Sequence, residues 1–295
     1  MSAAPCRAES IAELQSLLGR LFVDEEIAQG LKIKLSSTDV VITPFAKSGT
    51  TLLQQMVHTL RTRGDMDFDD ISRVVPWIET SYALGLDIHA EQRATPRAFK
   101  SHLDYEAIPK EGKYINSVRH PGDVLISFYK FMEGWLLAPG AVSIDEFAEQ
   151  HFIPSGAYWK HLRSWWPRRH SSQVLFLAYE EMIKQPVETI QRVATFIEVP
   201  LDDELLALTK KHTSISFMLQ HKNRFDDAMM RELSEIRCRL PSGSDSTKVR
   251  KGQIGEHKQQ LSSALNRKLA EVWQEEITKP LGLNNYEELL AELNR

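Results

Sequence analysis

Two kinds of hydrophobic pattern alternate along the chain. Short β-branched or apolar runs predict buried strands at 39–43, 98–101, 113–119 and 174–179. Apolar residues at helical spacing predict helices at 10–30, 50–62, from Pro121 onward, 187–197, 202–212, 258–277 and 286–294. Strands that alternate with helices predict an α/β fold, with a central parallel sheet flanked by helices in a single domain over 1–295.

Three further segments carry local signals. The sequence Ser143-Ile-Asp-Glu146 is a capping box that predicts the start of another helix. Residues 159–170 mix aromatic and basic side chains, and their spacing predicts an amphipathic helix with three apolar residues inward: Trp159, Leu162 and Trp166. The polar stretch 241–252 predicts a mobile surface loop.

Composition narrows the class of protein. Among 295 residues, 42% are hydrophobic and 26% are charged, which excludes a disordered or low-complexity chain. The net charge of -4 argues against a nucleic-acid partner. The absence of a long apolar run predicts no membrane span, and an N-terminus without a signal peptide predicts a cytoplasmic protein. With 2 cysteines, we expect neither a disulfide framework nor a cysteine-rich zinc site.

The first predicted strand leads into a candidate anion site, Lys47-Ser-Gly-Thr-Thr51. The N–H groups at a helix N-terminus favour anions, and Gly49 lets the backbone come close to one. Lys47 adds a positive charge. Hydroxyl donors come from Ser48, Thr50 and Thr51. The loop is P-loop-like in position only, because Ile42 and Ala46 occupy the places where a nucleoside-triphosphate loop needs glycine. The alternative is a polar turn that caps a helix.

Three later segments add cations and a base. Arg119 ends a predicted strand, and Ser127 follows about two turns into the next helix. An arginine at the end of a parallel strand is suited to bind a phosphate. The alternative is that Arg119 forms a surface ion pair with Asp123. Arg250-Lys251-Gly252 is either a second anion contact or a solvated basic loop. In Lys100-Ser-His102, the histidine is either a general base or a structural residue.

In this order, from about residue 38 to 280, these segments resemble the cytosolic sulfotransferases, which use 3′-phosphoadenosine 5′-phosphosulfate (PAPS) and release adenosine 3′,5′-bisphosphate (PAP). The family's loop reads Pro-Lys-Ser-Gly-Thr-Thr-Trp, whereas Ala46 and Leu52 replace its Pro and Trp here. The Trp flanks adenine in the family. The resemblance therefore implies a retained phosphosulfate loop with altered adenine stacking.

The resemblance also assigns roles to individual residues. It implies that His102 is the catalytic base, and that Lys47, assisted by Lys100, stabilises the leaving group. The implied nucleotide contacts are Lys47, Ser48, Gly49, Thr50, Thr51, Arg119, Ser127, Tyr179, Ser216, Phe217, Arg250, Lys251 and Gly252. No metal is required. The alternatives are a nucleotide-dependent phosphotransferase, which the failed glycine pattern disfavours, and a binder that has lost catalysis.

The acceptor is expected to be a small molecule with a hydroxyl or an amine. Arg73 to Glu79 resembles a family segment beside the acceptor pocket, and five aromatic residues lie in or near such segments: Trp77, Tyr82, Phe131, Trp135 and Tyr158. Core packing is the alternative for at least half of them. Glu79, Asp104, Glu106 and Glu133 would give a negative rim suited to a cationic acceptor.

Two expectations concern assembly and origin. Where the family's dimer motif has Thr-Val and then Glu after its lysine, this chain has Ser262-Ser263 and Arg267 after Lys258. The usual dimer is therefore not supported, and the oligomeric state stays open. The departures from the vertebrate-like motifs indicate a microbial relative that modifies a natural product.

Overall fold

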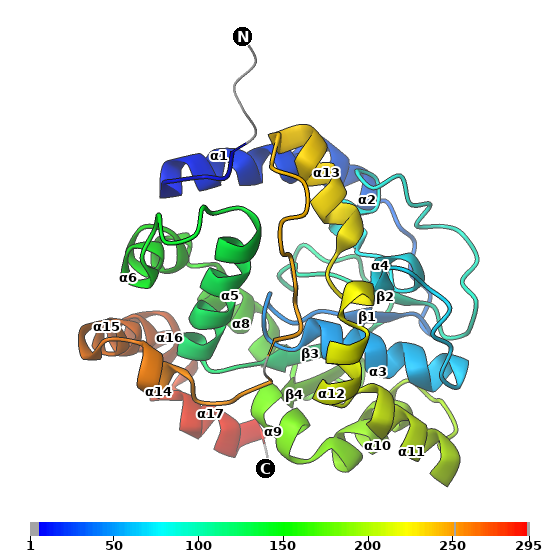
Figure 1. The fold of residues 1–295 in the computed structure, drawn as a ribbon. Coiled ribbons are helices and arrows are strands. Elements are labelled where there is room, and N and C mark those ends of the chain that lie inside the picture. The colour runs from blue at the N-terminus through cyan, green and yellow to red at the C-terminus, as the bar shows by residue number, and fades with distance from the viewer. Residues whose placement is uncertain (1–5, 251, 294–295) are drawn as a thin grey trace.

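A computed structural model describes residues 6–250 and 252–293. Its centre is a parallel sheet with the strand order β2-β1-β3-β4, formed by β1 (Val40–Ile42), β2 (Ala98–Lys100), β3 (Lys113–Val118) and β4 (Val174–Ala178) (Figure 1). In the register, Val41 lies opposite Phe99 on one side and Tyr114 on the other. The predicted parallel sheet covered by helices is confirmed.

Both faces of the sheet are buried, which is why the strands read as continuous apolar runs. The side chains of Val40 and Ile42 join one hydrophobic cluster, together with α3 (Thr50–Thr62) and α10 (Pro186–Phe196). Val41 points the other way, into the larger cluster. That cluster also includes residues of α1 (Ile11–Leu21), α5 (Pro121–Trp135), α8 (Ala157–Trp165) and α15 (Ser263–Trp273). The alternation along a strand thus divides the core between the two faces.

The remaining helices surround these two clusters (Figure 1). Over the N-terminal half they are α1 (Ile11–Leu21), α2 (Asp24–Gly30), α4 (Ile71–Val74), η1 (Ile78–Thr80), α5 (Pro121–Trp135), α6 (Ile144–Phe147), η2 (Ala148–Phe152) and α7 (Ile153–Ser155). Further on they are α8 (Ala157–Trp165), η3 (Trp166–Arg168), α9 (Tyr179–Lys184), α11 (Asp203–His212), α12 (Ile215–Gln220), η4 (Lys222–Arg224), α13 (Ala228–Cys238), α14 (His257–Gln260), α15 (Ser263–Trp273), η5 (Gln274–Thr278), α16 (Lys279–Leu281) and α17 (Tyr286–Leu293). None in the described ranges is both long and apolar enough to cross a bilayer.

Two predicted helices are wrong in extent. The helix expected at 10–30 is two helices, because Val23 is extended and the acidic residues that follow begin α2. The helix expected at 258–277 breaks at Leu261, which is also extended, and the Ser262 side chain then caps α15. Apolar spacing continues across both breaks, so it does not reveal them. The helices α12 and α13 were not predicted.

The local signals at helix starts are confirmed. The Ser143 hydroxyl accepts from the Glu146 N–H at the start of α6, and Pro121 occupies the first turn of α5. In residues 159–170, α8 and η3 bury the predicted apolar side, with Trp159, Leu162 and Trp166 all buried.

The segment 241–250 is irregular, as predicted, but it is not simply a surface loop. Ser244, Ser246 and Val249 are buried, and the Asp245 N–H donates to the Gly134 carbonyl of α5 over 3.0 Å. In Figure 1 this segment descends from the end of α13 beside α5. Internal hydrogen bonds and buried side chains explain why a polar stretch packs against the fold.

Ile42→Ala should lower the free energy of unfolding by about 2–5 kcal/mol, because Ile42 lies fully buried in the central strand. Urea denaturation measures this loss. The control is Ile236→Ala, at a side chain 78% exposed on α13, which should leave stability nearly unchanged. Equal losses in the two variants would contradict the assigned core.

Candidate active site

The loop between β1 and α3 has the backbone of an anion site. Lys47 and Gly49 have φ angles of 70° and 103°, in the left-handed region, and so turn the chain into the helix N-terminus. A Cβ at Gly49 would come within 3.0 Å of the Tyr179 ring. No side chain caps α3, so its first N–H groups are left for a ligand.

Buried donors around this loop lack protein partners. The hydroxyls of Ser48 and Thr50 are buried without a hydrogen bond, and so is the Nε of Arg119. Unpaired buried polar groups are rare unless a ligand or water satisfies them. The donor set therefore fits a phosphosulfate group, and half-buried Thr51 lies next along the helix.

Arg119, just beyond β3, connects the loop to distant segments. Its Nη1 donates to the Lys47 carbonyl and its Nη2 to the Gln253 carbonyl, both over 3.1 Å. Its guanidinium carbon lies 4.4 Å from the centre of the Tyr179 ring. The structure thus brings together the residues predicted at the ends of the first, third and fourth strands.

The other predicted 3′-phosphate contacts come from α5 and from the irregular segment before α14. Ser127 lies half-buried on α5, and Gly252, with a φ of 61°, lies against Ile215 of α12. Arg250 forms a two-pronged ion pair with Glu256, one prong of which is 3.1 Å long. A phosphate at Arg250 would have to compete with that carboxylate. Lys251 lies outside the described residues.

His102 follows β2 and is held in one tautomer. Its Nδ1 lies 2.7 Å from the Pro44 carbonyl, and a carbonyl only accepts, so Nδ1 carries the proton and Nε2 keeps its lone pair. Its main-chain N–H donates to Glu79 over 2.7 Å. Burial, and then the nearby Lys100 charge, lower the pKa of His102 well below its usual value. The His102 imidazole is therefore neutral at physiological pH, and its Nε2 can accept a proton.

Two lysine side chains, of Lys100 and Lys248, act on His102 through their charge. Lys100 is buried, with its Nζ 3.7 Å from the centre of the Trp77 ring and 3.9 Å from Asp227. Burial lowers the pKa of Lys100 to about 7, although Asp227 opposes the shift. The Nζ of Lys47 lies 4.0 Å from the Phe131 ring centre. Burial, followed by the charge of Lys248, lowers the pKa of Lys47 well below its ordinary value.

Sequence reasoning missed two charged residues here. Lys248 forms an ion pair with the buried carboxylate of Asp227. The same carboxylate lies 3.9 Å from the Nζ of Lys100. Neither residue belongs to a motif. The only signal is that Lys248 stands two positions before Arg250.

The five predicted pocket aromatics fall into three groups. Trp77 and Phe131 cover the two lysines. Trp135 and Tyr158 are buried in the core, where the Trp135 indole donates to Ser234 and the Tyr158 hydroxyl donates to the Arg119 carbonyl. Core packing describes these two. The side chain of Tyr82 is 59% exposed.

Several predicted rim carboxylates have partners within the protein. Glu79 is buried beneath His102, and burial raises its pKa. Asp104 pairs with Lys160 over 2.6 Å. Glu133 accepts from the Tyr129 hydroxyl over 3.1 Å. Each of these three carboxyls therefore has a partner within the protein, and the negative rim stays a prediction.

The predicted adenine-side residues lie on α12 and α9. The Phe217 ring stacks on His212, with ring centres 4.4 Å apart. The Ser216 hydroxyl lies 3.2 Å from that of Ser214. Tyr179 begins α9 beneath Arg119, and burial raises its pKa.

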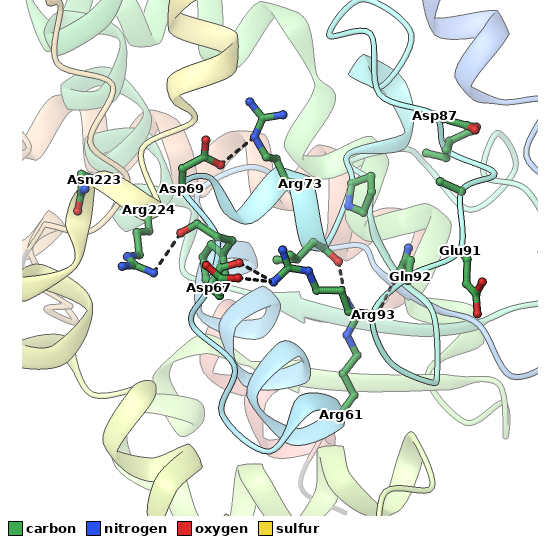
Figure 2. Close-up of a pocket in the computed structure, with 15 residues that line it drawn as sticks. Arg61, Asp67, Asp69, Arg73, Asp87, Glu91, Gln92, Arg93, Asn223 and Arg224 are labelled. Carbon is green, nitrogen blue, oxygen red and sulfur yellow. Dashed lines mark hydrogen bonds and ion pairs between the residues drawn. The ribbon is translucent and has the colours of Figure 1, made fainter.

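A hollow of about 690 Å³ lies beside α3 and the segment 87–93 (Figure 2). Four arginines line it: Arg61, Arg73, Arg93 and Arg224. All four already donate to carboxylates, carbonyls or amides of the protein. None of the individually predicted site residues lines it, although Arg73, Val74 and Pro76 belong to the segment 73–79 that the resemblance places beside the acceptor pocket. Across residues 6–250 and 252–293, no group of three or more histidine, cysteine or acidic side chains could hold a metal.

Comparison with known proteins identifies the class. The family model described as the sulfotransferase domain matches residues 37–280. Sulfotransferase 1B1 of Canis lupus familiaris is 28% identical over 255 residues, which cover 81% of this chain and 83% of the relative. Amine sulfotransferase of Oryctolagus cuniculus is 25% identical and covers 88% and 87%.

Solved structures show the same fold. Retinol dehydratase with androsterone and PAP superposes with a TM-score of 0.69 at 18% identity, covering 90% of this chain and 94% of that one. A mouse sulfotransferase complexed with PAP gives 0.67 at 22% identity, covering 92% and 94%.

The chain therefore belongs to the sulfotransferase family, over nearly the range that the motifs indicated. The expected activity, PAPS-dependent transfer of a sulfuryl group to a small molecule, is confirmed at the level of the family. Neither the family match nor the relatives support the phosphotransferase alternative.

The protein should take up protons when it binds PAP near neutral pH. The pKa of buried Lys100 is about 7, so much of it is neutral at pH 7 and above, and a bound anion would favour its protonated form. Nucleotide affinity should fall as pH rises above about 7. Calorimetry at about pH 7.5, in two buffers of different ionisation enthalpy, measures the uptake. Uptake that persists undiminished in Lys100→Met would contradict this assignment.

Proposed function

We propose that His102, Lys47 and Lys100 perform the transfer at the carboxyl edge of the sheet. The observation that carries this proposal is the placement of a neutral His102, with Nε2 free, beside the lysine cluster at the anion loop. PAPS supplies the sulfuryl group and departs as PAP. His102 accepts the acceptor's proton at Nε2.

The two lysines have a separate electrostatic role. Negative charge develops on the oxygen that bridges sulfur and the 5′-phosphate, and a cation fixed nearby stabilises it. Lys47 follows β1 and Lys100 ends β2, which are neighbouring strands. Thr50, Thr51 and the first N–H groups of α3 hold the 5′-phosphate, while Ser48 and Gly49 shape the loop.

At the other end of the nucleotide, Arg119, Ser127 and the segment 250–252 bind the 3′-phosphate. Arg119 supports this role because its Nε is buried without a partner. Arg250 contributes when the phosphate displaces Glu256 or binds beside it. Tyr179, Ser216 and Phe217 border the adenosine. A nucleotide with a phosphate at each end would thus satisfy two separate groups of cations.

The acceptor is a small molecule with a hydroxyl or an amine, and it binds beside Trp77 and Phe131. The crystallised relatives include complexes with retinol and androsterone, and another relative is named an amine sulfotransferase. Both kinds of acceptor nucleophile therefore have a precedent in the family. A microbial, natural-product-modifying role stays a prediction.

We also propose a single cytoplasmic domain over 1–295 with no nucleic-acid partner. The net charge of -4 supports the last point. At the altered dimer motif, the Ser262 hydroxyl accepts from the Leu265 N–H over 3.1 Å, so it serves as a helix cap. The oligomeric state stays open.

His102→Ala should reduce turnover by about 10²–10⁴-fold, because it removes the general base, while PAP still binds. Release of PAP from PAPS, with 4-nitrophenol and benzylamine as probes, measures turnover. The control is His170→Ala, at an exposed histidine, which should behave like the wild type. Near-normal turnover in His102→Ala would place the base elsewhere.

Arg119→Met should show the opposite pattern. Losing a charged hydrogen bond to the 3′-phosphate should weaken PAP binding by about 1.5–3 kcal/mol, or roughly 10–150-fold. The same substitution should change AMP binding much less, because AMP lacks the 3′-phosphate. Calorimetric titration with both nucleotides measures the difference, and equal losses would contradict the 3′-phosphate assignment.

A further inference from the structure

One carboxylate lies among three lysines beside the proposed base. Asp227 is 3% exposed, and its Oδ2 pairs with Lys248 and lies 3.9 Å from the Lys100 Nζ. The charge of Lys248 is the largest charge effect on the pKa of Lys47, after burial. Lys100 and Lys248 therefore share one carboxylate, and the charge of Lys47 interacts with theirs.

Asp227 is fixed by the segments around it. It has a φ of 50°, in the left-handed region, immediately before α13. The Ser72 hydroxyl of α4 donates to its Oδ1 over 3.4 Å. The neighbouring Asp70 accepts from the Ser72 and Met229 N–H groups and so joins α4 to α13. The carboxylate that faces the lysines is thus held between two helix starts.

Lys248 is fixed as well, although it lies in an irregular segment. The Ser246 hydroxyl donates to the Asp226 carbonyl and accepts from Arg231, and Val249 is buried. The Lys248 side chain is only 11% exposed. Its ammonium group therefore points inward, toward Asp227, rather than into solvent.

The charges of this cluster do not balance within the protein. With the three lysines protonated and Asp227 ionised, two positive charges lack an ion-pair partner of their own, and burial raises the pKa of the neighbouring Asp70 carboxyl, which favours its neutral form. Buried Glu79 already accepts from the His102 N–H, and burial raises its pKa. An excess of buried positive charge is costly unless an anion compensates it. The cluster is therefore suited to an anionic group at the position of Lys47 and Lys100.

We propose that Lys248 is a third cation on the transferring sulfuryl group, and that Asp227 is the positioning residue that keeps Lys248 beside Lys100. This inference rests on the proposed function. Lys248 shares the carboxylate of Asp227 with Lys100, its charge acts on Lys47, and it stands two residues before Arg250 at the nucleotide's other end. The segment 248–250 thus contributes to both ends of the donor.

The transfer step remains balanced with Lys248 present. The acceptor's nucleophilic atom forms a bond to sulfur, and the bond from sulfur to the 5′-phosphate oxygen breaks with its electron pair on that oxygen. The acceptor's proton goes to Nε2 of His102. Lys248 donates hydrogen bonds to the sulfuryl oxygens throughout and exchanges no proton.

The primary test compares PAPS with PAP, which differ by the sulfuryl group. Lys248→Met should lower the affinity for PAPS about 10-fold or more, while PAP affinity changes less than about 3-fold. It should also lower kcat about 10²-fold with 4-nitrophenol. Lys248→Arg retains the charge and should recover most of kcat. The control is Lys210→Met, at an exposed lysine of α11.

Asp227→Asn tests the positioning role. It should lower kcat without abolishing PAP binding, and its effect should not add to that of Lys248→Met in the double variant. Thermal midpoints of all variants show whether each is folded. Fully additive losses would contradict a role through Lys248.

Three outcomes would overturn the inference. Equal losses of PAPS and PAP affinity in Lys248→Met would make the residue structural. A raised KM for an anionic acceptor, with unchanged kcat and PAPS affinity, would assign Lys248 to the acceptor instead. A wild-type protein that binds neither nucleotide would reject the proposed function itself, and the inference with it.

Discussion

The burial of positive charge at the carboxyl edge of the sheet is the constraint on which the rest of the site depends. Lys100 and Lys248 share the carboxylate of Asp227, and Lys47 lies next to them in the loop. A bound anion stabilises the fully protonated form of this arrangement. A chain with a net charge of -4 must gather its cations locally to achieve this.

The parallel sheet makes this concentration possible. Because its strands run in the same direction, the segments after β1, β2, β3 and β4 all emerge at one edge. The anion loop, His102, Arg119 and Tyr179 are four such segments, distant in sequence and adjacent in space. The segment after α13 then adds Lys248 and Arg250 from the C-terminal third of the chain. The fold thus supplies a rigid edge, and the irregular segment completes the site.

The sequence predicted the features that depend on local pattern. The buried strands and the loop at Lys47 could be identified because strand runs and a glycine between hydroxyl residues have characteristic spacing. The ion pair of Arg250 with Glu256, the core positions of Trp135 and Tyr158, and the Lys248–Asp227 pair depend on tertiary contacts. Single lysines and aspartates carry no periodic signal, so only the folded arrangement shows that these two meet.

The most direct test of the account is calorimetric titration of the wild-type protein with PAP, and with AMP, ADP and ATP for comparison. A site with cations at both ends of an adenosine should bind PAP much more tightly than the three nucleotides that lack a 3′-phosphate. Each lost charged contact should cost about 1.5–3 kcal/mol. PAP binding no tighter than that of ADP, or preferential binding of ATP, would contradict the two-ended anion site.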